Sequence, residues 1–175
     1  LLDLSLTEAR HKEMLGVIRE SGALLLSVLN DILDMSKIEA GKLSLEIAPF
    51  KPADLAPSVE ALHGVSARHK NIDLVVWTGE GLDETRLGDI HRVQQILHNL
   101  VSNAIKFTTA GEVSVTIEAC TGQPLSLKIK DTGPGMTRSQ VERVFDEFEQ
   151  ADVSIARRHG GTGLGLAIVK HVLNH

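Results

Sequence analysis

The apolar residues of the first forty positions recur at the spacing of one face of a long helix. Ile18, Leu25 and Ile32 are each seven residues apart, close to the repeat of a coiled coil. Thr7 can cap the start of this helix and Gly41 can close its end. A helix of roughly thirty-odd residues spans about 50 Å, too long for a small domain to cover. We therefore expect a self-association surface, and packing against the helix's own chain is the alternative.

After Leu43 the pattern changes to short alternating runs, which predict strands, separated by stretches with helical spacing. The expected strands are residues 43–47, 72–77, 112–117 and 125–130, the last two as a hairpin. The expected helices are residues 52–70, a helix that starts near Asp89, and residues 166–173. These elements do not alternate strictly as strand, helix and strand. The sequence therefore predicts an α/β sandwich, with helices on one face of a mixed sheet.

Glycines crowd the entrance of the last predicted helix. Gly160, Gly161, Gly163 and Gly165 fall within six residues. Glycine loses the most backbone freedom on folding, so a cluster here indicates backbone N–H groups that approach an anion at the positive end of the helix dipole. A flexible turn before an ordinary helix is the alternative.

A carboxylate follows the predicted strand at 125–130. Asp131 precedes a turn that contains Gly133 and Gly135. Strand ends in α/β folds commonly bind ligands, and a carboxylate can accept a hydrogen bond from an exocyclic amine such as that of adenine. A turn-forming aspartate with no ligand is the alternative.

The helix that starts near Asp89 carries a third set of polar residues. Asn99, Asn103 and Lys106 fall within one narrow sector on the flank of its apolar face. Amide oxygens suit Mg²⁺, and a lysine one turn further suits a phosphate. An ordinary solvated face is the alternative.

Together these residues resemble the N, G1, F and G2 sequence boxes of sensor histidine kinases of two-component systems. Residues 36–42 are also similar to the end of the second dimerisation helix of hybrid-type kinases. The resemblance covers nearly the whole chain. It implies a partial dimerisation and phosphotransfer helical domain over residues 1–42 and an ATP-binding catalytic domain of the histidine kinase and gyrase type over residues 43–175. The boxes correspond, in the family's order, to residues 99–108, 131–136, 144–150 and 161–166.

The resemblance implies ATP and Mg²⁺ as cofactors and gives named residues a role. Asp131 would hold the adenine amine, and Asn103 with Asn99 would hold the metal. Lys106 and Arg158 would face the phosphates, so Asn99, Asn103 and Lys106 form the expected catalytic set. The other expected nucleotide-binding residues are Gly133, Gly135, Phe145, Gly161, Thr162, Gly163, Leu164 and Gly165.

Residues 132–160 would form the ATP lid, with a short helix as the ordered part. Ser139 and Glu142 have the spacing of a capping box at the start of this helix. For Phe145, simple core packing is the alternative to a place in the lid. For Arg158, the alternative is a solvated basic turn.

The implied reaction is transfer of the ATP γ-phosphoryl group to a histidine, followed by relay to an aspartate of a receiver domain. Asn99 stands where hydrolysing relatives have a glutamate, and an amide cannot act as a general base, which favours transfer over hydrolysis. None of the eight histidines is followed by the acidic residue and nearby proline of the family's acceptor motif. We therefore expect the acceptor before Leu1 and further strands after His175. A non-catalytic nucleotide-binding scaffold is the alternative function.

Composition limits the remaining function classes. A net charge of −5 argues against a nucleic-acid surface. No run approaches the ~18 apolar residues of a membrane span, and no signal peptide is visible. Cys120 is the only cysteine, which excludes an intramolecular disulfide and fits a cytoplasmic setting. The expected partners are a second copy of the chain, through the N-terminal helix, and a receiver domain. Membrane anchoring of a longer parent protein stays open.

Overall fold

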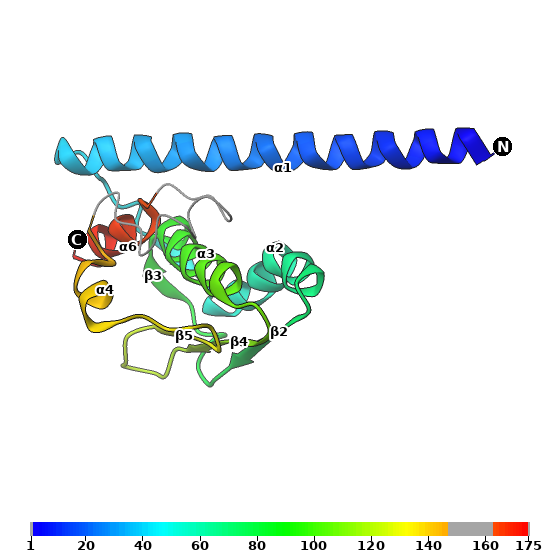
Figure 1. The fold of residues 1–175 in the computed structure, drawn as a ribbon. Helices are drawn as coiled ribbons and strands as arrows, with labels where there is room; N and C mark the ends of the chain where they lie inside the picture. The colour runs from blue at the N-terminus through cyan, green and yellow to red at the C-terminus, as the bar shows by residue number, and fades with distance from the viewer. Residues whose placement is uncertain (1, 147–162, 175) are drawn as a thin grey trace. The chain divides into compact units, whose positions relative to one another are not determined.

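The computed structural model describes residues 2–146 and 163–174 of the 175-residue chain (Figure 1). The chain divides into two compact units, Leu1–Leu43 and Ser44–His175. Within the described residues, the first unit is a single helix, and the second contains both sheets and the other helices.

Helix α1 (Leu2–Glu39) forms the first unit. It begins before Thr7, so the predicted cap at Thr7 is wrong; residues 2–7 contain no proline or glycine that would end a helix. It ends as predicted at Gly41, whose N–H donates to Ile38 O at 2.9 Å while Lys42 N–H donates to Lys37 O at 2.8 Å. No helix in the described part of the chain is both long and apolar enough to cross a membrane.

The second unit is an α/β sandwich, as the sequence predicts. Its main sheet has the strand order β2-β4-β5, with β2 parallel and β5 antiparallel to β4. A two-stranded antiparallel sheet pairs β1 with β3. The elements in chain order are β1 (Ala48–Phe50), the 3-10 turn η1 (Pro52–Asp54), α2 (Leu55–His69), β2 (Ile72–Thr78), β3 (Arg86–Gly88), α3 (Ile90–Phe107), β4 (Gly111–Glu118), β5 (Ser126–Asp131), α4 (Arg138–Arg143) and α6 (Gly165–Leu173).

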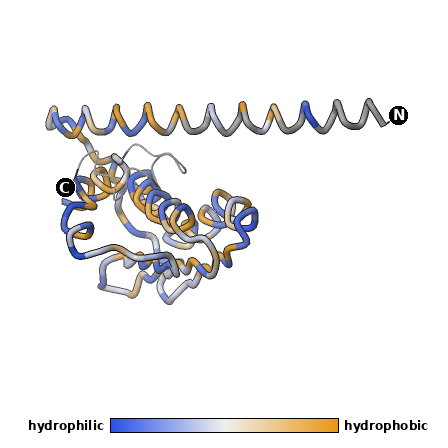
Figure 2. The backbone as a smooth tube through the Cα atoms, in the orientation of Figure 1, coloured by the Kyte–Doolittle hydropathy of each residue, from blue (hydrophilic) through white to orange (hydrophobic). Residues whose placement is uncertain are grey.

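The core lies between the main sheet and the helices α2 and α3, which pack against each other and against the sheet (Figure 1). Alternate residues of the central strand, Val113, Val115 and Ile117, are fully buried, as are Leu97 and Val101 of α3. Apolar and polar residues alternate around the turns of α3 in Figure 2. Each aliphatic side chain buried in this way stabilises the fold by about 1.5–3 kcal/mol.

The prediction of a strand at 43–47 is wrong, because β1 begins only at Ala48. The backbone N–H of Glu46 donates instead to Asp89 Oδ2 at 3.0 Å, so this segment is held by a side chain and not by a strand partner. Ile47 exposes 59 % of its surface, so the alternating apolar residues here do not face a core.

Asp89 is the N-cap of α3, which begins where the sequence predicts. Its Oδ1 accepts a hydrogen bond from Arg92 N–H at 3.0 Å, in addition to the bond from Glu46 to Oδ2. Burial opposes the charged form of this carboxyl, but the backbone hydrogen bonds outweigh it and lower the pKa of Asp89. The cap therefore fixes where the helix that carries the candidate site begins.

Candidate nucleotide-binding site

The polar sector predicted on α3 is present. Asn99, Asn103 and Lys106 are all half-buried, beside the buried apolar residues Val101 and Ala104. Asn99, Asn103 and Lys106 are therefore among the half-buried polar side chains that α3 offers at the border of the core.

The start of α6 meets this sector. Asn99 Nδ2 donates a hydrogen bond to Gly165 O at 3.3 Å. A Cβ atom at Gly165 would stand 3.5 Å from Asn99 Cγ, so the start of α6 packs against the Asn99 side chain. Leu164, only 1 % exposed, anchors the turn before the helix in the core. Asn99 and Gly165, which are far apart in the sequence, thus lie side by side, whereas Gly161, Thr162 and Arg158 lie outside the described residues.

The turn after β5 meets the other end of α3. Asp131 Oδ1 accepts a hydrogen bond from Gly133 N–H at 2.8 Å, which fixes the carboxylate within the turn. Its second oxygen, Oδ2, accepts no hydrogen bond from the described residues. A Cβ atom at Gly133 would stand 3.3 Å from Phe107 O and 2.8 Å from Asp131 Oδ1. A side chain at this position would crowd Phe107 O and displace the Asp131 carboxylate, so glycine favours the contact of this turn with the last turn of α3.

Two further candidate glycines have backbone conformations that favour glycine. Gly135 has a φ of 69° and Gly163 a φ of 73°, in the left-handed region that other residues adopt only at a steric cost. Their identity is therefore explained by the backbone in this structure, with or without a ligand.

Lys106 lies in the last turn of α3, next to the Asp131 turn. Its Nζ is 5.1 Å from the centre of the Phe107 ring. Burial lowers the pKa of Lys106, and the charge of Lys70 lowers it further. A partly desolvated ammonium group is well suited to bind an anion.

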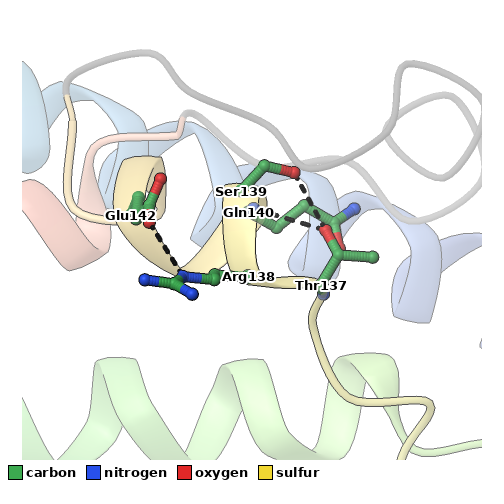
Figure 3. Close-up of polar contacts among 5 residues, drawn as sticks. All are labelled: Thr137, Arg138, Ser139, Gln140 and Glu142. Atoms are coloured by element: carbon green, nitrogen blue, oxygen red, sulfur yellow. Dashed lines mark hydrogen bonds and ion pairs between the residues drawn. The ribbon is translucent and has the colours of Figure 1, made fainter.

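The described part of the lid contains the short helix α4, but its cap differs from the prediction. Thr137 is the N-cap: its Oγ1 accepts from Gln140 N–H at 3.4 Å, and Gln140 Oε1 accepts from Thr137 N–H at 2.8 Å (Figure 3). The box predicted for Ser139 and Glu142 is wrong, because both residues lie within the helix. Glu142 pairs instead with Arg138 at 3.4 Å, on the exposed surface.

Phe145 follows α4 and exposes 41 % of its surface, so it does not have the core position that was the alternative to a lid role. Nearby, Asp146 Oδ1 lies 3.9 Å from Lys170 Nζ of α6. Both side chains are about half exposed, so this pair contributes little to stability. The lid residues from 147 to 160, with Arg158, lie outside the described residues.

Two observations test whether these residues suit a bound nucleotide and metal. Thr108, directly after α3, is fully buried, and its Oγ1 has no hydrogen-bond partner among the described residues. Such an atom indicates a missing water or ligand contact. No group of three or more His, Cys, Asp or Glu side chains that could hold a metal occurs in the part of the chain described. A divalent ion at α3 would therefore depend on amide oxygens and on the ligand's phosphates, a donor set that Mg²⁺ accepts.

Sequence reasoning missed one residue at this site. Lys70 Nζ donates to the backbone oxygens of Ile105 and Lys106, each at 2.8 Å. A basic side chain near the end of a helix ordinarily donates to the last carbonyls of that same helix. The pattern around Lys70 therefore gave no sign of a contact 35 positions away.

The turn after β5 and the glycine-bearing start of α6 thus both lie against α3 on an α/β sandwich, the arrangement of a nucleotide-binding domain. Residues 88–175 match the family of histidine kinase-, DNA gyrase B-, and HSP90-like ATPases, and the chain belongs to this family. The prediction of an ATP-binding catalytic domain of the histidine kinase type is confirmed.

Curated relatives agree with this assignment. The signal transduction histidine-protein kinase BarA of Escherichia coli K12 is 40% identical over 168 residues, which are 94% of this chain and 18% of BarA. The sensor histidine kinase GacS of Pseudomonas protegens is 41% identical over 177 residues, which are 99% of this chain and 19% of GacS. The chain therefore spans less than a fifth of the length of either relative.

Solved structures give the same result. Full-length ShkA in complex with AMPPNP matches with a TM-score of 0.74 and 36% identity, over 92% of this chain and 33% of ShkA. The histidine kinase AdeS of Acinetobacter baumannii matches with a TM-score of 0.67 over 86% of this chain and 67% of that one. At 24% identity, AdeS supports the fold alone.

Proposed function

We propose that this chain is the ATP-binding core of a two-component sensor kinase, which transfers the γ-phosphoryl group of ATP to a histidine outside this chain. The observation that carries the proposal is the contact of α3 with both glycine-bearing segments: Gly165 lies against Asn99, and Gly133 lies against Phe107. The names of the relatives support the reaction, because both BarA and GacS are named as kinases.

In this proposal each segment binds a different part of Mg-ATP. The carboxylate of Asp131 accepts a hydrogen bond from the adenine amine. Asn103 and Asn99 offer amide oxygens to Mg²⁺, and Lys106 faces the phosphates with Arg158. The backbone of the glycine-rich segment, residues 161–165, closes on the phosphates. When bound, Mg²⁺ neutralises phosphate charge, and catalysis of phosphoryl transfer consists mostly of such neutralisation and of positioning.

Asn99 favours transfer over hydrolysis. The bond between the γ-phosphorus and the bridging oxygen breaks, a bond to an imidazole nitrogen forms, and ADP leaves. A competing attack by water needs a group that removes its proton, and the amide of Asn99 cannot do so. The hydrogen bond from Asn99 to Gly165 O further restrains this side chain.

The first unit supplies the proposed partner surface. Leu15, Ile18 and Leu25 of α1 expose 66%, 64% and 60% of their surfaces. We propose that residues 1–42 belong to a dimerisation and phosphotransfer domain that pairs with a second copy, and that residues 43–175 are the catalytic domain. A receiver domain accepts the phosphoryl group in a cytoplasmic setting. The alternative of a non-catalytic scaffold has no support from the relatives.

Replacing Asp131 tests the adenine contact. We expect Asp131→Asn to weaken ATP binding by about 1–3 kcal/mol, the scale of a lost hydrogen bond to a charged group. Calorimetric titration of the purified chain measures it. Asp73→Asn, on an exposed position of β2, is the matched control and leaves affinity unchanged. Equal affinities for all three proteins would remove Asp131 from the site.

A further inference from the structure

Lys70 ends α2 in sequence, but its side chain binds a different helix. Its backbone N–H donates within the last turn of α2, while Nζ donates to Ile105 O and Lys106 O at 2.8 Å each. These two oxygens belong to the last turn of α3. An ammonium group is favourable there, because the final carbonyls of a helix lack partners within it and form the negative end of its dipole.

Helix α3 needs a donor from outside because of how it ends. The chain leaves the helix at Thr108 in an extended conformation, with φ −79° and ψ 128°, and Thr108 N–H donates back to Ala104 O at 3.0 Å. An extended exit does not fold the next backbone N–H groups onto the carbonyls of Ile105 and Lys106, as a glycine-closed end would. Lys70 supplies those hydrogen bonds.

The turn that Lys70 holds is the one that carries Lys106. It is also the turn against which Gly133 lies, since a Cβ atom there would stand 3.3 Å from Phe107 O. The charge of Lys70 also acts on Lys106, whose pKa it lowers after the larger effect of burial. Lys70 is therefore coupled to Lys106 in two ways: its side chain binds the backbone oxygen of Lys106, and its charge acts on the Lys106 ammonium group.

We propose that Lys70 is a positioning residue for the nucleotide phosphates. By binding two consecutive carbonyls it fixes the last turn of α3, and so holds the Lys106 side chain where it meets a phosphate. This inference rests on the proposed function, because it requires Lys106 to bind the phosphates of ATP.

A double-mutant cycle separates this role from a purely structural one. ATP affinity is measured by calorimetry for the parent chain, Lys70→Met, Lys106→Met and the double variant. We expect Lys70→Met to weaken ATP binding about tenfold when Lys106 is present, and by less than about twofold in the Lys106→Met background. Lys70→Arg, which keeps the charge and several donors, retains most of the affinity. Lys128→Met, at an exposed position of β5, is the control and has no effect.

The possible results are distinct. Equal losses from Lys70→Met in both backgrounds would mean that Lys70 acts only on the fold, and would overturn the proposal. Unchanged ATP affinity in Lys106→Met alone would instead remove Lys106 from the phosphate site, and with it the proposed function's assignment. If Lys70→Met does not fold, as judged by its thermal melting, Lys70→Ala closes the same cycle, because it also removes the ammonium donor.

Discussion

Helices α1 and α3 both carry apolar residues at helical spacing, which gather on one face more sharply in α3 than in α1, and these residues are buried to very different extents. Leu97 and Val101 of α3 are fully buried against the sheet and α2, whereas Ile18 and Leu25 of α1 expose 64% and 60% of their surfaces. Periodicity therefore identifies the face of a helix that will be buried, but not what will bury it. For α3 the partner is within its own unit, and for α1 we propose that it is a second copy of the chain.

Because their apolar faces are buried to different extents, the two helices are also suited to different functions. Because α3 is fixed by its core contacts, its polar flank can hold Asn99, Asn103 and Lys106 in constant positions relative to the Asp131 turn. The stripe of α1 contributes to stability only when another surface covers it. Substitutions in the two stripes should therefore affect different measurements.

The largest expected effect is on the folding of the second unit. Leu97→Ala leaves a cavity in a fully buried position, so we expect the free energy of unfolding to fall by about 2–5 kcal/mol. Urea unfolding followed by circular dichroism measures this. In contrast, Leu25→Ala should change the unfolding of that unit by less than about 0.5 kcal/mol. Similar losses of unfolding free energy from both variants would show that the two stripes do not differ in their contribution to the folding of this unit.

The next effect is on self-association. Leu25→Asp would bury an unpaired charge in the proposed dimer, so we expect the dimer to weaken by about 1–3 kcal/mol. Sedimentation equilibrium gives the dimer dissociation constant. Asp131→Asn, which changes the other unit, serves as the control and leaves this constant unchanged. A monomeric parent chain at all accessible concentrations would contradict the role given to α1.

A smaller effect follows from a histidine pair between α2 and α3. His63 Nε2 and His98 Nδ1 are 3.1 Å apart. Burial, and then the charge of His98, lower the pKa of His63 to about 4 from 6.5. The folded state therefore favours neutral His63, whose contribution to stability is complete above pH 6.5 and is lost as the pH falls from 6.5 towards 4.

We expect that loss to be about 1–2 kcal/mol, less than the shift alone implies because the ring is partly solvated. Urea unfolding at a series of pH values measures it. His63→Gln should flatten the decline over this range, while His69→Gln, exposed on the same helix, should not. The same pH dependence in the parent and in His63→Gln would show that other groups cause it.

Much of this architecture follows from the sequence, for identifiable reasons. The strands β2, β4 and β5 and helix α3 were predicted because each has one face that the core buries, which leaves a clear period. The short strands β1 and β3 have three residues each, too few to show one. At 43–47 the apolar residues alternate but are largely exposed, so the period there was misleading.

The candidate site likewise has features that can be predicted from the sequence and features that cannot. Glycines, Asp131 and the sector on α3 could be found because their types and spacing are unusual. Two features could not be read from spacing: the cap at Thr137, where two overlapping capping patterns compete, and the contact of Lys70. Both depend on which side chain reaches a given backbone group, and only the folded backbone decides that.

The central claim is that the second unit performs the chemistry on a histidine supplied from elsewhere. The most direct test incubates the purified chain with γ-labelled ATP and Mg²⁺, alone and with a dimerisation fragment of its parent protein that carries the acceptor histidine. We expect acid-labile, base-stable label on the added fragment only, and none when Asn103→Ala replaces the parent chain. Label on the chain alone would mean that one of its own eight histidines is the acceptor, and would contradict the account. An added fragment that stays unlabelled although the chain binds ATP would also contradict the account, because it would show that no phosphoryl transfer takes place.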